Sequence, residues 1–190
     1  PRRVTEAFYG PMSNGVLWPT LHSMPATVEL GTAPWAAYVA ANEAFAHAAR
    51  EAGGAEAHYW IHDYHLLLVP GLLRPRVPSA RIGWFCHVPW PSSDLFATLP
   101  WRVEMLEGML GADLLGFHTD GYGQRFLECV ARLTDHEVDA ARRVVRFGGR
   151  EVRVITAPIG ISWDDGQRLA GSAEVERRLR HVRREIHDRP

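Results

Sequence analysis

HYWIHDYHLLLVPGLLRPRVPSARIGWFCHV, residues 58–88, contains two short apolar runs that each end in polar side chains. The runs at 58–63 and 81–88 have the length and composition of strands, and residues 65–74 between them have the pattern of a short helix. A strand, a helix and a second strand in this order are typical of parallel strands joined by a crossover. This segment therefore predicts an α/β fold.

The rest of the chain continues the alternation. Helices are predicted over residues 33–50, 101–110 and 121–133, and further strands over 113–119, 144–147 and 152–157, with a hairpin at Gly148-Gly149. Pro34 suits the first turn of the first helix, and Gly53 suits its end. We therefore predict a Rossmann-like parallel sheet with helices on both faces. Ligands bind at the carboxyl ends of strands in such sheets, where Asp63 and His87 fall.

Two parts of the chain differ in composition. Residues 8–25, rich in Gly, Pro, Ser, Asn and aromatic residues, are interpreted as a loop with a short helix around Val16 to Leu21. We assign residues 1–162 to the domain that contains the sheet and residues 163–190 to a charged helical segment. Glu and Arg stand four residues apart in that segment, so we interpret it as a solvated surface helix rather than a polyanion site.

Charge and composition disfavour several functional classes. The formal net charge is −1, which argues against general binding to nucleic acids or membrane surfaces. All 21 basic residues are arginine, so a phosphate must be held by arginine, by a backbone N–H or by a group outside this chain. No run approaches the roughly 20 apolar residues of a membrane span.

The two cysteines, Cys86 and Cys129, stand in apolar surroundings. We predict buried, reduced thiols, which suit a cytoplasmic setting. The chain begins at Pro1 and no signal-peptide pattern follows it, so we expect the sequence to start within a longer protein.

FYGPMSNGVLWP, residues 8–19, places aromatic side chains in a stretch rich in Gly and Pro. A Trp ring can pack on the apolar face of a pyranose, and a Tyr hydroxyl can donate a hydrogen bond to a phosphate. Tyr9 and Trp18 are therefore candidate binding residues. The motif alone equally allows Trp18 to cap the core.

WIHDYH, residues 60–65, crowds polar side chains at the end of an apolar strand. Asp63 can accept hydrogen bonds from two sugar hydroxyls. His62, Asp63 and His65 could instead hold a metal, but they span a turn rather than one helical face, so we assign no metal. The next strand ends at His87, and two prolines stiffen the turn that follows. A rigid turn presenting a His suits a ligand site; a core His bonded to a backbone carbonyl is the alternative.

Five blocks follow one another between residues 8 and 162: FYGPMSNGVLWP, WIHDYHLLLVPGLLR, RIGWFCHVPWPSSDLFATLPWR, LEGMLGADLLGFHTDGYGQRFLECV and APIGIS. Together they resemble the trehalose-6-phosphate synthase family, retaining glycosyltransferases with a two-domain GT-B fold. Their shared order and spacing are far more specific than any single block. The resemblance implies the N-terminal, acceptor-side half of a GT-B fold, incomplete at its own N-terminus and without the C-terminal nucleotide-sugar domain.

The resemblance also implies a role for each candidate residue. Tyr9 would contact the phosphate of glucose 6-phosphate, and Trp18 would lie by the acceptor sugar and bear on anomer selection. Asp63 would bind acceptor hydroxyls and His87 would contact the donor glucose, so both are expected to serve in catalysis. Val88, at a position that is commonly Ile in the family, is also linked to anomer choice.

The implied reaction moves glucose from UDP-glucose or GDP-glucose to the anomeric hydroxyl of glucose 6-phosphate. No cofactor and no metal are implied, because Arg and Lys side chains of the C-terminal domain neutralise the diphosphate in this family. That domain and a phosphate-binding Arg expected before Pro1 are not in the chain, so we predict that the chain alone is inactive or nearly so. Formation of a homo-oligomer stays open.

Alternative hypotheses keep the fold and change the function. The protein could be a glucosylglycerol-phosphate synthase or a pseudo-glycosyltransferase of the validamycin kind, although Tyr9 and Trp18 favour a phosphosugar acceptor. It could also be a non-catalytic, synthase-like subunit that binds sugar phosphate. A structural domain without a ligand is disfavoured, because polar and aromatic residues cluster where a core would not need them.

Overall fold

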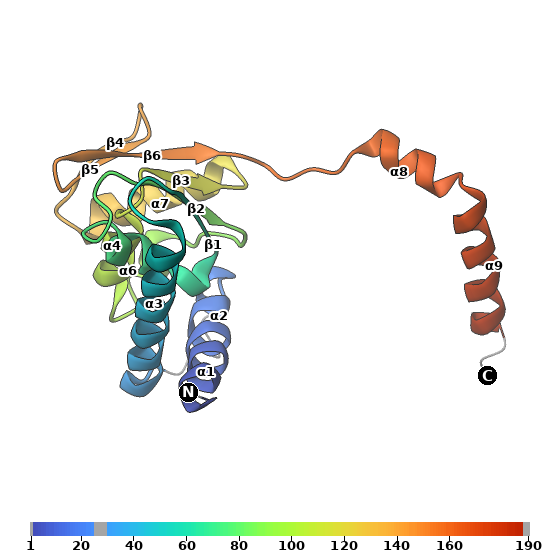
Figure 1. Ribbon diagram of the computed structural model, residues 1–190, viewed down its shortest axis with the longest axis horizontal. Helices are drawn as coiled ribbons and strands as arrows, with labels where there is room; N and C mark the ends of the chain where they lie inside the picture. The colour runs from blue at the N-terminus through green and yellow to red at the C-terminus, as the bar shows by residue number, and fades with distance from the viewer. Residues whose placement is uncertain (1, 25–29, 188–190) are drawn as a thin grey trace. The chain divides into compact units, whose positions relative to one another are not determined.

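The computed structural model describes residues 2–24 and 30–187. The chain divides into two units, Pro1–Pro158 and Ile159–Pro190, and each is described by itself. The first unit contains a six-stranded sheet with helices packed against it (Figure 1). The α/β class predicted from the sequence is therefore confirmed.

The strands are β1 (His58–His62), β2 (Arg81–Cys86), β3 (Leu114–Phe117), β4 (Glu137–Asp139), β5 (Val144–Phe147) and β6 (Arg150–Thr156). Their order across the sheet is β1-β2-β3-β6-β5-β4. The first four strands in this order are parallel, which is the predicted Rossmann-like arrangement. β5 and β4 add an antiparallel edge, and β4 was not predicted. The predicted hairpin joins β5 to β6, and both of its glycines, Gly148 and Gly149, have positive φ.

The helices of the first unit are α1 (Arg2–Ala7), the π-helix η1 (Phe8–Leu17), α2 (Trp18–Leu21), α3 (Thr32–Gly53), the 3-10 helix η3 (Tyr64–Leu66), α4 (Val69–Leu73), α5 (Ser93–Phe96), α6 (Arg102–Met109) and α7 (Asp120–Leu133). Pro34 and Gly53 lie in the first and last turns of α3, as predicted. The helix predicted over residues 65–74 consists of η3 and α4. The short helix α5 was not predicted.

The N-terminal segment contradicts the expectation of a loop, although α2 lies within the short helix predicted around Val16 to Leu21. From residue 8 onward it forms η1 and then α2, which continue α1 without a break. Phe8, Met12 and Val16 recur every four residues, and all three are buried. This helical spacing was hidden by the Gly and Pro residues between them, since those residues usually mark turns. The expectation for Pro25 lies outside the described residues.

The helices that contact the parallel strands cover one face of the sheet, and Figure 1 shows α3, α4 and α6 on the same side of the strands. The row of neighbouring side chains on this face consists of Ile61, Trp84, Leu115 and Val154, all buried. The order β1, β2, β3, β6 always moves in one direction across the sheet. Right-handed crossovers then bring every connecting helix to the same face.

The opposite face is open over the described residues. Its row contains Trp60, Gly83, Leu114 and Arg153. Trp60 is 67% exposed, and the row lines a hollow of about 600 Å³. We expected helices on this second face as well. Among the described residues, the helices that contact the parallel strands lie on the first face.

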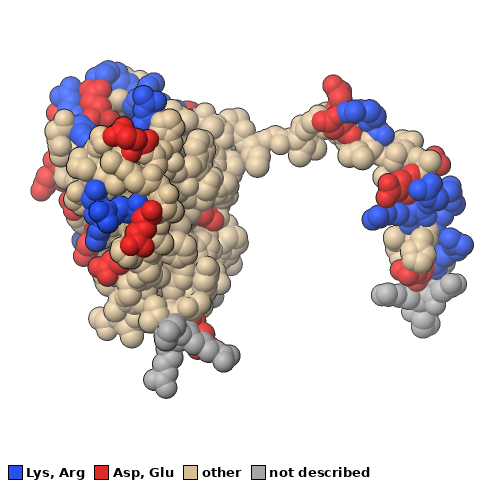
Figure 2. All heavy atoms as spheres, in the orientation of Figure 1, with Lys and Arg blue, Asp and Glu red and all other residues tan. Residues whose placement is uncertain are grey.

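Charged side chains gather at the antiparallel edge, where Figure 2 shows both signs close together. Arg146 lies 2.8 Å from Glu137, and Arg142 lies 3.0 Å from Glu151. Exposed pairs of this kind contribute little to stability, because water screens both charges. They make a mixed surface rather than a patch of one sign, in keeping with the net charge of −1.

The second unit contains α8 (Trp163–Ala170) and α9 (Ala173–His187). The predicted pairs form on α9, with Glu174 bound to Arg178 and Glu176 to Arg180. The helix also carries an apolar stripe that the sequence interpretation missed, and its members include Leu179, Val182 and Ile186, all exposed. Across residues 2–24 and 30–187, no helix is both long and apolar enough to cross a membrane.

Candidate functional site

Tyr9 and Trp18 come from the N-terminal helices. Tyr9 lies in η1 and is 47% exposed, and Trp18 begins α2 and is 43% exposed. The other side of the same helices is buried against the core, with Phe8, Met12 and Leu17 all at 2% exposure or less. Two large aromatic side chains thus stay at the surface of a segment that is otherwise well packed.

Each of these aromatic side chains packs toward the residues that follow β1. The ring centroids of Tyr9 and His65 are 5.7 Å apart, and those of Trp18 and Tyr64 are 5.9 Å apart. Trp18 also lies over His22, with ring centroids 3.8 Å apart. The Tyr64 hydroxyl donates to Oδ1 of Asn14 in η1 at 3.3 Å. The N-terminal helices and the HDYH segment therefore form one continuous surface.

Asp63 follows β1 directly and has an unusual backbone, with φ 71° and ψ 169°. Its N–H donates to the carbonyl of Phe85 at 2.8 Å, which continues the pairing of β1 with β2. Its Oδ1 accepts a long hydrogen bond of 3.4 Å from the N–H of His87, and its Oδ2 lies 3.9 Å from Nδ1 of His65. The carboxylate therefore stands between the two histidines.

His87 follows β2 at the same edge of the sheet. Its Nε2 lies 2.8 Å from Nδ1 of His62, the last residue of β1. Its ring also contacts Phe85 and His118, with centroid distances of 4.9 Å and 5.7 Å. Val88 is buried beneath this turn, and its carbonyl accepts a hydrogen bond from the Cys86 thiol at 3.2 Å.

The local environment sets the charge states. Burial, with a smaller contribution from the Asp63 carboxylate, raises the pKa of Tyr64 to about 12, so this phenol is a neutral donor at physiological pH. Burial lowers the pKa of His65, although Asp63 opposes the shift. Tyr64 and His65 are therefore neutral neighbours of Asp63, whose carboxylate keeps capacity to accept hydrogen bonds from a ligand.

The structure brings the sequence-predicted residues to one edge. Tyr9 contacts the ring of His65, whose Nδ1 lies 3.9 Å from the Asp63 carboxylate, and that carboxylate accepts the hydrogen bond from His87. Trp18 joins this series through Tyr64, whose ring also contacts His65. Parallel strands place their carboxyl ends together, which is why residues 24 apart in sequence meet here. Val88 lies in the same turn but faces the core.

Sequence reasoning missed two neighbours of His87. His62 was considered only as a metal ligand, and His118 falls in the segment 113–119, which was interpreted as a structural strand. Nδ1 of His118 is buried and has no hydrogen-bond partner among the described residues. Both histidines end or directly follow a parallel strand, and that position was a signal that could have identified them.

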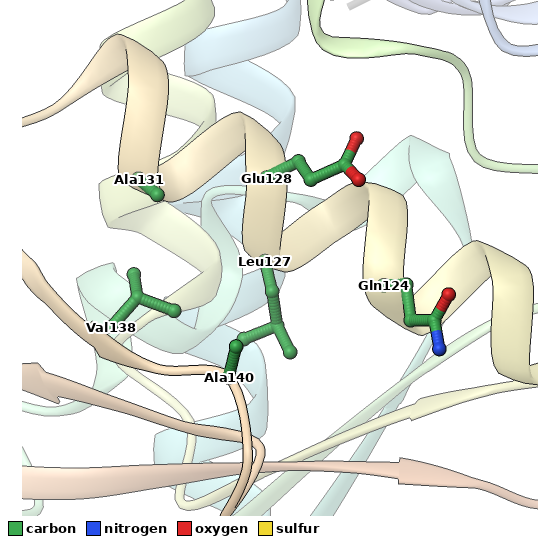
Figure 3. A pocket seen from close by; sticks show the side chains of 6 residues that line it. All are labelled: Gln124, Leu127, Glu128, Ala131, Val138 and Ala140. Carbon is green, nitrogen blue, oxygen red and sulfur yellow. The ribbon is translucent and has the colours of Figure 1, made fainter.

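A pocket of about 350 Å³ lies elsewhere, between α7 and the β4 region (Figure 3). Leu127, Ala131, Val138 and Ala140 give it an apolar lining, and Gln124 and Glu128 also border it. It contains none of the sequence-predicted site residues. The candidate site is thus the polar and aromatic edge described above, not this hollow.

Rossmann-like α/β domains of this kind build the GT-B glycosyltransferases, and the chain has the fold of one half of such a protein. Within that class it belongs to glycosyltransferase family 20, whose family model matches residues 1–189. The resemblance found in the five sequence blocks is therefore confirmed.

Curated relatives agree with this assignment. The trehalose-6-phosphate synthase of Mycobacterium sp. (strain KMS) is 39% identical over 186 residues, which are 94% of this chain and 38% of the relative. The alpha,alpha-trehalose-phosphate synthase (UDP-forming) A of Dictyostelium discoideum is 37% identical over 181 residues, which are 95% of this chain and 24% of the relative. The chain thus spans well under half the length of these relatives.

Solved structures share the fold. An alpha,alpha-trehalose-phosphate synthase (UDP-forming) from Burkholderia xenovorans, in complex with glucose-6-phosphate, matches 99% of this chain and 42% of its own, with a TM-score of 0.88 and 27% identity. A structure from E. coli bound with UDP-2-fluoro glucose matches 89% of this chain and 37% of its own, with a TM-score of 0.82 and 32% identity. The N-terminal domain of a Candida albicans trehalose-6-phosphate phosphatase matches 94% of this chain and 38% of its own, with a TM-score of 0.82 and 37% identity.

Proposed function

We propose that this chain forms the acceptor-side part of a retaining glucosyltransferase that makes trehalose 6-phosphate. Glucose moves from a nucleotide-glucose to the anomeric hydroxyl of glucose 6-phosphate. The observation that carries the proposal is the gathering of Tyr9, Trp18, Asp63 and His87 on one edge of the sheet from three separate segments. The matching relatives are named for this activity.

The acceptor site is formed by the N-terminal helices and Asp63. The Tyr9 hydroxyl donates to the phosphate, and the half-exposed Trp18 ring packs on the apolar face of the sugar. Asp63 accepts hydrogen bonds from sugar hydroxyls. Val88 supports the wall behind His87, and together with Trp18 it selects the anomer of the acceptor.

The donor glucose lies against His87, and UDP-glucose is the donor, since the Dictyostelium relative is named UDP-forming and the E. coli structure holds a UDP-sugar. Positive charge develops on the transferred sugar in the transition state, and Asp63 stabilises it electrostatically. The leaving diphosphate is neutralised by residues outside residues 1–190. The chain alone therefore turns over slowly or not at all. The proposed location of the reaction is the cytoplasm.

The test uses the full-length parent protein and follows release of nucleoside diphosphate. UDP-glucose and GDP-glucose serve as donors, and glucose 6-phosphate, glycerol 3-phosphate or water as acceptors. We expect release that depends on glucose 6-phosphate. Trp18→Ala should raise KM for glucose 6-phosphate by about 5-fold, because an aromatic contact contributes about 1 kcal/mol.

Phe45→Ala is the matched control, because Phe45 lies on α3 with 46% exposure, close to the value for Trp18. It should leave KM unchanged. A preference for glycerol 3-phosphate would mean that the proposed acceptor is wrong, while the fold assignment would stand. No release from any donor and acceptor pair would discard the enzymatic proposal.

A second candidate is a non-catalytic domain that binds sugar phosphate. The Candida albicans match favours it, because a domain of this fold occurs there in a protein named as a phosphatase. In that case glucose 6-phosphate would bind to the parent protein without turnover, and Trp18→Ala would weaken the binding. Calorimetry with glucose 6-phosphate separates this outcome from a misfolded enzyme.

A further inference from the structure

His62 is the last residue of β1, and the proposed reaction does not use it. Its Nδ1 lies 2.8 Å from Nε2 of His87, and the two ring centroids are 5.1 Å apart. β1 and β2 are hydrogen-bonded neighbours, and His62 is paired with Phe85. The backbone of two paired strands therefore sets the separation of the two rings.

A hydrogen bond between one nitrogen of each neutral ring allows only two arrangements. If Nδ1–H of His62 donates, Nε2 of His87 carries no proton and the proton of His87 lies on Nδ1. If Nε2–H of His87 donates, Nδ1 of His62 is bare and its proton lies on Nε2. In both arrangements the two rings have the same tautomer, so each ring determines the other.

The remaining contacts of His87 hold the ring without using its second nitrogen. Phe85 and His118 pack against it, and its backbone N–H donates to Asp63. Within the described residues, no hydrogen bond engages Nδ1 of His87. Nδ1 is therefore the ring nitrogen that a ligand at this edge can reach.

We propose that His62 is a positioning residue, which couples the tautomer of His87 to its own and leaves Nδ1 of His87 available to a sugar hydroxyl. The identity of the ligand rests on the proposed function, whereas the tautomer shared by the two rings rests on the hydrogen bond alone. This arrangement resembles the general use of a partner group to select the tautomer of a functional histidine.

The surroundings keep the pair suited to this role. Asp63 and His118 are the titratable groups that face it from the neighbouring segments. Partial burial and then the neighbouring His87 lower the pKa of His62, and Asp63 opposes the shift. At neutral pH His62 is therefore an uncharged partner with one donor and one acceptor nitrogen.

The test is ¹⁵N-detected NMR of the histidine rings in the 190-residue chain, with no substrate present. We expect His62 and His87 to show one and the same tautomer at pH 7.5. In His62→Phe the partner nitrogen is lost, and the His87 signals should shift to the averaged values of exchanging tautomers. His62→Asn keeps a polar atom near the place of Nδ1 and should move the His87 signals back toward those of the unsubstituted chain.

His58→Phe is the matched control, because His58 begins the same strand and faces the same side of the sheet. It should leave the His87 signals in place. Opposite tautomers on His62 and His87 would overturn the proposal. So would His87 signals that are the same in His62→Phe and in the unsubstituted chain.

An activity measurement on the full-length parent adds the functional consequence. His62→Phe should lower kcat by about 10- to 100-fold, the usual effect of losing a group that orients a functional side chain. KM for glucose 6-phosphate should change less than kcat, since the acceptor residues Tyr9 and Trp18 lie on other segments. A full kcat would overturn the positioning role. Absence of turnover in the unsubstituted parent would defeat the proposed function but would not alter the NMR result.

Discussion

At the scale of single residues, the strained backbone of Asp63 lowers the stability of the folded chain. Its φ of 71° and ψ of 169° lie in a region that essentially only glycine adopts without strain. The strain is about 1–3 kcal/mol. The neighbouring structure holds it there, because the N–H of Asp63 donates to Phe85 and its carboxylate accepts from His87. In return, the carboxylate stands at the edge where the other site residues meet.

Replacing Asp63 should therefore separate stability from function. Asp63→Gly relieves the backbone strain, and we expect the free energy of unfolding to rise by about 1 kcal/mol. Activity of the parent protein should nevertheless be lost, because the carboxylate is gone. Urea denaturation of the chain and diphosphate release by the parent measure the two effects.

Asp63→Ala is the control for this prediction. It removes the same carboxylate but keeps the strained backbone, so it should lose activity without becoming more stable. Equal stability of the Gly and Ala variants would show that the backbone of Asp63 stores no strain.

At the scale of elements, the π-helix η1 explains why Tyr9 and Trp18 act together. Nine positions separate them, which is two and a half turns of an α-helix and would place them on opposite faces. A π-helix has more residues in each turn, so nine positions complete about two turns. Both side chains then lie on the same face, where they contact His65 and Tyr64.

Two glycines of α7 lead to opposite predictions. A methyl group at Gly121 would meet open space, whereas one at Gly123 would overlap the Arg143 guanidinium and crowd Val154. Gly121→Ala should therefore raise the free energy of unfolding by about 0.5 kcal/mol, at the lower end of the gain in a helix interior, because Gly121 lies in the first turn of α7. Gly123→Ala should lower it, because Arg143 would have to leave its ion pair with Asp120.

Thermal denaturation of the two variants beside the unsubstituted chain checks this pair. The two substitutions are chemically identical and two residues apart in one helix, so each serves as the control for the other. Equal shifts in Tm would mean that α7 does not pack on β6 as closely as Val154 indicates.

At the scale of the whole molecule, the strand order determines which surface the sheet leaves open. Helices cover the face with Trp84 and Leu115, and the face with Trp60 is open over the described residues. Covering both faces requires strand connections that run in both directions from a central strand. The connections between the described parallel strands all lead in the same direction across the sheet, from β1 to β2, β3 and β6.

Buried thiol and phenol groups should make the stability of the whole domain decrease at alkaline pH. Burial raises the pKa of both Cys86 and Cys129 to about 12, and it also raises the pKa of Tyr38. The folded chain keeps these protons while the unfolded chain releases its thiol protons near pH 9. The contribution of each thiol to the free energy of unfolding is therefore fully present below pH 9. Between pH 9 and pH 12 it decreases by about 1.4 kcal/mol per pH unit.

Urea denaturation between pH 8 and pH 10.5 measures this slope. Cys86→Ala should be less stable at pH 8, because it leaves a small cavity, but its loss of stability with pH should be shallower by one proton. A slope that is identical in the variant and in the unsubstituted chain would contradict neutral, buried Cys86.

The sequence alone determined the α/β class, most element positions and the candidate site residues, because each depends on local patterns. Apolar runs of strand length, helical spacing and turn residues are properties of short segments. Asp63 and His87 could be placed at a ligand edge because the carboxyl ends of parallel strands always share one side of the sheet. The five sequence blocks also identified the family, because their order and spacing can be read from the linear chain.

Only the tertiary structure decided how those residues meet. The π-helix at Phe8–Leu17 could not be predicted, because its Gly and Pro residues indicate turns and the packing of Phe8, Met12 and Val16 overrides them. The His62–His87 hydrogen bond depends on the register between β1 and β2, which no local pattern encodes. The open face follows from the strand order, because long-range pairing, not local preference, chooses each strand's neighbour.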